Sequence, residues 1–164
     1  MVSVSDYERL AQRKMSAMCR ALVEGGAADE LTIAWNRSAF DSIRLRPRVL
    51  VDVSRVDTSI SLLGACLPHP ILLAPTAYHR MVHSGGEVET ARGASQCGAL
   101  YVVSSATNTR VQPIAQAAKG PLWFQMYVQS DRGFVTEVIR EVEAAGCQAL
   151  VITVDAPVVG ARYR

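Results

Sequence analysis

The sequence predicts an α/β fold that makes up about half of a (β/α)8 barrel, preceded by an N-terminal helical arm. Four apolar runs of strand length, each ending in polar residues, support this prediction; they lie at residues 71–74, 101–103, 122–124 and 150–154. Continuous apolar runs are typical of strands buried on both faces in a parallel sheet. Helical patterns alternate with these runs, which indicates βα units. A closed barrel has eight such units and takes about 250 residues, so these 164 residues are expected to form about half of one.

Residues 1–58 are predicted to form the helical arm. Ser5 and Glu8 have the spacing of a capping box, which indicates the start of a helix, and Gly25 is expected to end that helix. A second helix is predicted from residue 29 to about residue 40.

Residues 59–164 are predicted to form a single incomplete domain. Two short apolar runs around Gly64 indicate a hairpin at the barrel floor. Ser84 and Glu87 have capping-box spacing at the start of the next helix, which Gly98 is expected to end. A later stripe with i, i+3, i+4 and i+7 spacing predicts a helix that docks on the sheet. Its residues are Val135, Val138, Ile139 and Val142.

The composition excludes several classes of function. The net charge is +2 and no basic stripe is interleaved with aromatic residues, which argues against nucleic-acid binding. No apolar stretch approaches the roughly 18 residues of a membrane-spanning helix, and the N-terminus lacks the pattern of a signal peptide. The 4 cysteines are far apart and are expected to be isolated thiols in a reducing compartment. A cytoplasmic protein without metal, nucleic-acid or membrane partners is therefore expected.

Several common catalytic motifs are missing from the sequence. There is no GxGxxG, no P-loop and no GxSxG elbow, so dinucleotide binding of the Rossmann type, P-loop chemistry and elbow-type serine hydrolysis lose their main support. His79 and His83 are four residues apart, but no glutamate follows His79. These histidines are interpreted as loop residues at the rim of a site rather than as zinc ligands.

Neutral hydrogen-bonding groups gather at the predicted strand ends. They are the hydroxyls of Thr76, Ser104, Tyr127 and Thr153, the side-chain amide of Gln125 and the backbone amide of Ala77, while Pro75 fixes the backbone just before Thr76. The carboxyl ends of barrel strands form the active-site face of such enzymes. Neutral donors and acceptors suit a flat heteroaromatic ring with carbonyl and nitrogen edges better than they suit a metal ion. The alternative is that each group satisfies backbone atoms at its own strand end, but the convergence of several favours a binding site.

Four segments resemble the FMN-dependent α-hydroxy acid oxidases and dehydrogenases, of the glycolate oxidase, lactate oxidase and flavocytochrome b2 type. They are LAPTA at residues 73–77, GEVETAR at 86–92, FQMYV at 124–128 and TVDAPVVGAR at 153–162. The resemblance runs from about residue 4 to the last residue and concerns the N-terminal half of the family's barrel. It implies FMN as the cofactor and oxidation of a 2-hydroxy acid to a 2-oxo acid by the complete enzyme.

The resemblance also implies a role for each candidate residue. Pro75, Thr76 and Ala77 would lie along the flavin, with the Ala77 amide near the reactive ring nitrogen. The flavin ring edge would be hydrogen-bonded by Ser104, Gln125 and Thr153.

The remaining candidates concern the substrate. Tyr127 would contact it, Asp155 would orient the imidazole that acts as the base, and Arg162 would lie at the mouth of the substrate pocket. Two positions depart from the family. Leu22 stands where many members have a tyrosine that holds the substrate carboxylate, and Ala106 stands where several have a tryptophan. Both departures imply a larger, drier pocket and a bulkier or altered substrate, which argues against glycolate in particular.

The family's catalytic histidine, substrate-binding arginine, flavin-contacting lysine and phosphate-binding loops belong to the second half of the barrel. The chain is therefore interpreted as the N-terminal half of such an oxidoreductase. The alternative is a non-catalytic truncated remnant that acts as a flavin-binding or assembly partner. A homo-oligomer, or a second chain that supplies the other half barrel, is expected in either case. The particular acid and the electron acceptor stay open at this stage.

Overall fold

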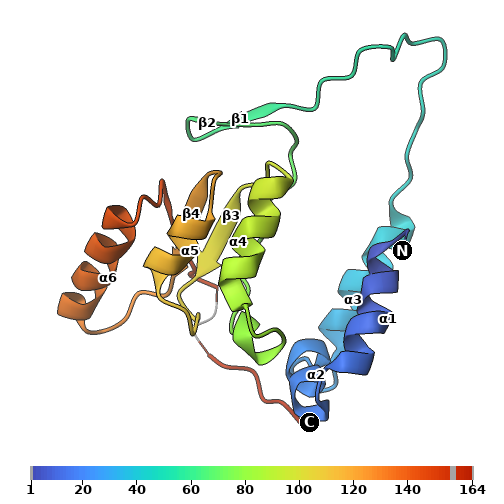
Figure 1. The fold of residues 1–164 in the computed structure, drawn as a ribbon. Coiled ribbons are helices and arrows are strands. Elements are labelled where there is room, and N and C mark those ends of the chain that lie inside the picture. Colours follow the sequence, from blue (N-terminus) through green and yellow to red (C-terminus); the bar gives the residue numbers. More distant parts are fainter. Residues whose placement is uncertain (1, 156–157, 164) are drawn as a thin grey trace. The chain divides into compact units, whose positions relative to one another are not determined.

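The computed structural model describes residues 2–155 and 158–163, and these fall into two compact units (Figure 1). The first unit comprises residues 2–55 and 158–163, and the second comprises residues 56–155. The first unit contains helices and the second contains all the strands of the described residues. With the exception of Arg162, the candidate site residues belong to the second unit.

The first unit contains three α-helices and one 3₁₀ turn. They are α1 (Val4–Lys14), α2 (Ala17–Glu24), α3 (Leu31–Ala39) and η1 (Phe40–Ser42). The sequence predicts one helix up to Gly25, and the structure divides it because Ser16 starts a new helix. The Ser16 hydroxyl accepts a hydrogen bond from the Cys19 N–H at 3.2 Å, which caps α2. Gly25 ends α2 as predicted.

The capping box predicted at Ser5 and Glu8 is wrong, since the N-cap of α1 lies two residues earlier. Ser3 is the N-cap of α1. The Asp6 carboxylate reaches back and accepts hydrogen bonds from the Val2 N–H at 2.7 Å and the Ser3 N–H at 3.1 Å. Asp6 therefore supplies the acidic partner that was assigned to Glu8.

A β-hairpin opens the second unit, as predicted. β1 (Ile60–Leu62) and β2 (Ala65–Leu67) pair antiparallel around a two-residue turn. Both turn residues have positive φ, +46° at Leu63 and +83° at Gly64. This backbone matches the right-handed twist of the strands, and glycine adopts it without steric cost.

A three-stranded parallel sheet follows, in the order β3 (Tyr101–Ser104), β4 (Leu122–Met126) and β5 (Leu150–Ile152). Helices alternate with the strands along the chain: α4 (Gly86–Gln96), α5 (Val111–Ala117) and α6 (Arg132–Ala144), with the 3₁₀ turn η2 (His79–Met81) before α4. Figure 1 shows the helices of this unit beside the strands. Parallel strands joined by helices are the βα units that the sequence predicts.

The strand predicted at residues 71–74 is reduced to a single bridge. Leu73 pairs with Tyr101; its N–H donates to the Leu100 carbonyl at 2.9 Å, and its carbonyl accepts from the Val102 N–H at 3.0 Å. Pro70 and Pro75 flank this segment, and proline has no N–H to extend a ladder. The polypeptide still lies beside β3, where a first barrel strand is expected.

Apolar side chains pack on both faces of the sheet. Tyr101, Val103 and Phe124 belong to one cluster together with residues of α4, α5 and α6. Leu100, Val102 and Trp123 form a second cluster with Leu67 of the hairpin. Since neighbouring strand residues point to opposite faces, the helices cover one face and the hairpin covers part of the other. Burial of each large apolar side chain contributes about 1.5–3 kcal/mol.

The helix stripe predicted for α6 is confirmed. Val135 and Val142 are buried, and Val138 and Ile139 pack against the same cluster. Across residues 2–155 and 158–163, no helix combines the length and apolar character that crossing a membrane requires. The cytoplasmic location expected from the sequence stays a prediction.

Candidate functional site

Ser104, Gln125 and Thr153 are joined by hydrogen bonds at the carboxyl ends of the three strands. The Ser104 hydroxyl donates to Gln125 Oε1 at 3.1 Å, and Gln125 Nε2 donates to Thr153 Oγ1 at 2.7 Å. The parallel register places Ser104 directly opposite Gln125. The Thr153 N–H, in turn, donates to the Met126 carbonyl at 3.1 Å. Sheet pairing thus gathers three residues that the sequence places at separate strand ends.

The Gln125 side chain is held tightly and has capacity for a ligand. It is 2% exposed, and its Oε1 also accepts from the Ser105 backbone N–H at 3.3 Å. A primary amide has two N–H donors, and among the described residues the bond to Thr153 uses one of them. This arrangement fixes which atom of Gln125 is the acceptor and which is the donor.

The segment that carries Pro75, Thr76 and Ala77 is exposed and follows the bridge at Leu73. The next residue, Tyr78, has a φ of +55°. Its N–H donates to the Ala106 carbonyl at 3.0 Å. The segment is therefore tied to the loop after β3, on the same side of the strands as Ser104.

Glu87 is a buried carboxylate, and the capping box predicted for it with Ser84 is wrong. Gly85, not Ser84, is the N-cap of α4, and no side chain caps that helix. Glu87 is 0% exposed; its Oε2 accepts from the Thr109 hydroxyl at 2.7 Å, and its Oε1 accepts from the His79 N–H at 3.3 Å. A signal was present, because Glu87 shares an i, i+4, i+7 stripe with the buried Ala91 and Ala94.

The hydrogen bonds decide the charge state of Glu87. Burial alone would raise the pKa of its carboxyl group, but the Thr109 hydroxyl and backbone N–H groups donate to the charged form and outweigh burial. The pKa of Glu87 therefore lies below its ordinary value of 4.5. The pKa of the nearby Tyr101 phenol is instead raised, first by its burial and then by the negative charge of Glu87.

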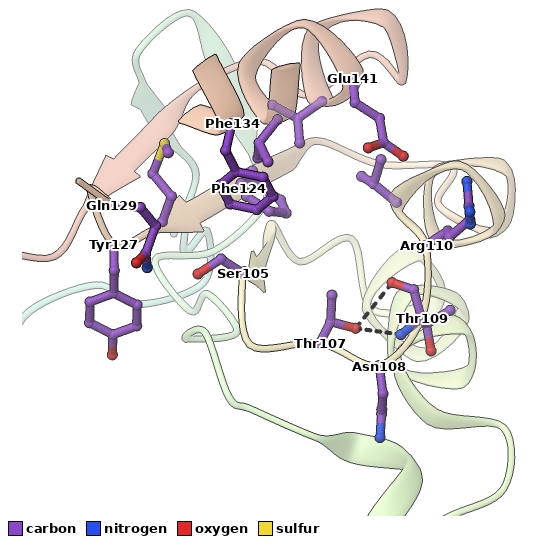
Figure 2. Close-up of a pocket in the computed structure, with 14 residues that line it drawn as sticks. Ser105, Thr107, Asn108, Thr109, Arg110, Phe124, Tyr127, Gln129, Phe134 and Glu141 are labelled. Carbon is purple, nitrogen blue, oxygen red and sulfur yellow. Dashed lines mark hydrogen bonds between the residues drawn. The ribbon is translucent and has the colours of Figure 1, made fainter. Parts of the chain in front are cut away.

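A pocket of about 550 Å³ lies between the loop after β3 and α6 (Figure 2). Its lining includes Thr107, Thr109, Arg110, Phe124, Tyr127 and Phe134. Phe124 and Gln125 are adjacent strand residues, so their side chains point to opposite faces of the sheet. The pocket is therefore on the helix-covered face, on the opposite side of the sheet from the Gln125 side chain, although Ser105, whose N–H bonds to Gln125, also lines it.

Tyr127 follows the end of β4 and is 43% exposed. Figure 2 shows its phenol pointing away from Phe124 and Phe134. Asp155 is exposed beyond the end of β5. These two residues lie in the same unit as Gln125.

Arg162 belongs to the other unit. Its Nη1 donates to the Leu22 carbonyl at 3.1 Å. The motif at residues 153–162 includes residues 156 and 157, which lie outside the described residues. No group of three or more histidine, cysteine, aspartate or glutamate residues in the described part of the chain could hold a metal ion.

Comparisons with known proteins show which family the chain resembles. The family model described as FMN-dependent dehydrogenase matches residues 11–164. Glycolate oxidase 3 of Oryza sativa subsp. indica is 41% identical over 162 residues, which cover 99% of this chain and 44% of that protein. Glycolate oxidase of Spinacia oleracea is 40% identical over 162 residues, with the same coverage of 99% and 44%.

Solved structures give the same result at the level of the fold. A mandelate oxidase variant with (S)-mandelic acid matches with a TM-score of 0.94 and 33% identity, over 99% of this chain and 48% of that chain. A flavocytochrome b2 variant with sulfite bound also matches with a TM-score of 0.94 and 33% identity, over 99% of this chain and 44% of that one. The chain thus spans about half the length of the relatives that it matches.

Proposed function

Because this chain belongs to the FMN-dependent dehydrogenase family, we propose that it supplies the flavin-ring side of an enzyme that oxidises 2-hydroxy acids to 2-oxo acids. The predicted family and the predicted half-barrel fold are confirmed by the relatives described above, and FMN is the cofactor of this family. The observation that carries the proposal is the hydrogen-bonded set Ser104, Gln125 and Thr153 at the carboxyl ends of the parallel strands.

The donors and acceptors of this set fit the edge of a flavin. Flavin presents carbonyl oxygens and ring nitrogens, and Gln125 can donate to one and accept from another. Bound FMN would supply the redox chemistry by accepting two electrons from the substrate. The chain's own contribution is to hold the ring: Gln125 orients its edge, and the exposed backbone at Thr76 and Ala77 offers N–H donors along it.

Two side chains would act on the substrate. The Tyr127 phenol is exposed and can donate a hydrogen bond to the substrate's oxygen atoms. The Asp155 carboxylate is also exposed and would orient a neutral imidazole supplied by the second half of the barrel. It would then stabilise the imidazolium that forms as the imidazole takes the proton of the substrate hydroxyl.

The small side chain of Ala106 favours a bulky substrate. Ala106 is held by backbone bonds on both sides, since its N–H donates to Ser104 Oγ at 3.1 Å and its carbonyl accepts from Tyr78. A methyl group at this fixed position leaves space that a tryptophan would fill. An aromatic 2-hydroxy acid is therefore the proposed substrate class, in preference to glycolate.

Flavin titration of the 164-residue chain tests the proposal. FMN and riboflavin should bind with dissociation constants within about threefold of each other, because the proposed contacts are to the ring, whereas barrel phosphate sites come from the loops after the seventh and eighth strands. Gln125→Leu should weaken binding of both at least tenfold, about 1.4 kcal/mol. Gln129→Leu, at an exposed neighbouring position, serves as the matched control.

The variants and the comparison of FMN with riboflavin distinguish the ways in which the proposal could fail. If Gln125→Leu does not fold, Thr153→Val removes the neighbouring hydroxyl with little change of shape and should weaken both flavins. Equal affinity of the Gln125→Leu and Gln129→Leu variants for flavin would contradict the proposed ring contact. FMN binding that exceeds riboflavin binding a hundredfold would place a phosphate site within these residues.

A non-catalytic assembly role is the second candidate function. It is favoured by β5, the terminal strand of the described sheet, where Leu150 and Ile152 are 38% and 44% exposed. Unpaired apolar strand edges recruit further strands. Combining the chain with the C-terminal half of a family member distinguishes the candidates: turnover of a 2-hydroxy acid supports the enzyme, and association without turnover supports the assembly partner.

A further inference from the structure

Glu87 contacts two loops that lie at the candidate site. The first is loop 75–81, which carries Ala77 and includes η2. The second is loop 105–110, which joins β3 to α5 and carries Ala106. The carboxylate accepts the N–H of His79 from the first loop at 3.3 Å and the hydroxyl of Thr109 from the second at 2.7 Å. One buried side chain therefore connects both.

The two loops also meet directly, through the Tyr78 N–H and the Ala106 carbonyl at 3.0 Å. Loop 105–110 is anchored at its beginning by Ser104, whose hydroxyl accepts from the Ala106 N–H at 3.1 Å. Its end is organised by two hydrogen bonds between Thr107 and Thr109, which Figure 2 shows. The Thr109 hydroxyl then donates to Glu87, so both ends of this loop are fixed.

A carboxylate suits this position better than any other side chain. It has two oxygens and no hydrogen to donate, and here each oxygen faces a donor from a different loop. An amide of the same length would turn an N–H toward one of these donors. In the part of the chain that the structure describes, the ion pairs do not include Glu87. Hydrogen bonds therefore offset the desolvation free energy of burying its charge.

We infer that Glu87 is a positioning residue, which holds loop 75–81 and loop 105–110 together and so fixes Ala77 relative to Ala106. Its consequence for flavin and substrate rests on the proposed function, because Ala77 is the proposed flavin neighbour and Ala106 the proposed determinant of substrate size. The loop connection itself does not depend on flavin. It can therefore be tested separately.

Amide hydrogen exchange of the full 164-residue chain measures the connection. The reporters are the amides of Tyr78 and His79, which bond to Ala106 and Glu87. Glu87→Gln should speed exchange of both reporters at least tenfold, while the amides of β3 and β4 change less than threefold. Glu89→Gln is the matched control on the same helix, since Glu89 is exposed and pairs with Arg92. It should leave the reporters unchanged.

A pair of variants at Thr109 separates hydrogen bonding from packing, and it decides the question even if Glu87→Gln does not fold. Thr109→Ser keeps the hydroxyl and loses the methyl group, so the reporters should remain protected. Thr109→Val keeps the shape and loses the hydroxyl, so their exchange should rise at least tenfold. If the serine variant exchanges as fast as the valine variant, or if neither Glu87→Gln nor Thr109→Val has an effect, the inference is wrong.

Flavin titration of the same Thr109 variants connects the inference to the proposed function. Thr109→Val should weaken riboflavin binding about threefold or more relative to Thr109→Ser. A chain that binds no flavin contradicts the proposed function, while the exchange rates still decide the role of Glu87. If Thr109→Val speeds amide exchange but leaves flavin affinity unchanged, Glu87 connects the two loops without positioning Ala77 for flavin. That part of the inference would then be wrong.

Discussion

The strands β4 and β5 have similar apolar sequences but very different surroundings. All five residues of β4 are buried, whereas Leu150 and Ile152 of β5 are 38% and 44% exposed. β4 has a strand on each side, and β5 has β4 on one side and ends the described sheet on the other. An apolar sequence therefore indicates where a strand can be buried, and neighbouring strands decide whether it is.

The same contrast separates the two edges of this sheet. At the carboxyl edge, Ser104, Gln125 and Thr153 satisfy one another and form a preorganised polar set. At the lateral edge, β5 exposes apolar side chains and, within the described residues, has a strand on one side alone, an arrangement that can recruit a further strand. The polar edge is suited to a ligand and the apolar edge to another chain or chain segment.

The largest effect expected from this contrast is on turnover. The 164-residue chain by itself should oxidise lactate, glycolate and mandelate at no detectable rate, because the role proposed for Asp155 is to orient a base, which it cannot replace. A general base contributes roughly 10²–10⁴-fold to rate. Stopped-flow measurement of flavin reduction under anaerobic conditions checks this. Reduction by mandelate that Asp155→Asn abolishes would show that these residues hold a complete catalytic site.

Alanine substitutions compare the two strands directly. Phe124→Ala in β4 should lower the free energy of unfolding by about 3–5 kcal/mol, because it leaves a cavity in the core. Ile152→Ala in β5 should cost about 1 kcal/mol or less, because the side chain is already 44% exposed. Urea unfolding followed by far-ultraviolet circular dichroism measures both. Equal losses would mean that β5 is covered as completely as β4 in solution.

Association should depend on the β5 edge. The chain is expected to form a homodimer or larger assemblies at micromolar concentration, since exposed apolar edges recruit other chains. Ile152→Lys should shift the chain toward monomer because a charge on the edge opposes pairing. Thr136→Lys, on the exposed surface of α6, adds the same charge away from the edge. Sedimentation velocity of the two variants checks this, and a stable wild-type monomer would contradict it.

A further effect concerns the pH dependence of stability through Glu87. Its pKa is lower in the folded chain than the ordinary 4.5, so the ionised carboxylate stabilises the fold. That stabilisation is fully present above pH 4.5 and is lost as the pH falls through the folded pKa. Glu87→Gln should therefore cost about 1–3 kcal/mol at neutral pH and less in acid. Unfolding at several pH values, with Glu89→Gln as the control, measures the difference. A cost that is independent of pH would show that the charge of Glu87 contributes nothing.

Thiol reactivity offers a further check on which surfaces are covered. Burial raises the pKa of Cys147 to about 11, whereas Cys66 and Cys97 are exposed. Alkylation at neutral pH should therefore modify Cys147 much more slowly than the other two, because the thiolate is the reactive form. Mass spectrometry of peptides after timed labelling measures the three rates. Comparable rates would mean that the region after α6 opens readily.

Much of the candidate site could be predicted, because it depends on strand ends. Ser104, Gln125 and Thr153 each follow or end an apolar run, and parallel pairing must bring such positions to one edge. Glu87 could not be identified in the same way. Its spacing from Ser84 fits a capping box, which predicts an exposed side chain at the start of a helix. Its spacing from Ala91 and Ala94 instead predicts a buried side chain, and this second prediction can be chosen only once α4 is known to pack against β3.

Local sequence determined the elements of this protein: the hairpin turn at Leu63 and Gly64, the helical stripe of α6 and the polar strand ends. These features depend on backbone preferences and on periodicity, which act over a few residues. Tertiary structure decided what the sequence left open. It reduced residues 71–74 to a bridge, buried Glu87 between two loops and placed β5 at the edge of the described sheet, because pairing and burial depend on neighbours that are distant in sequence.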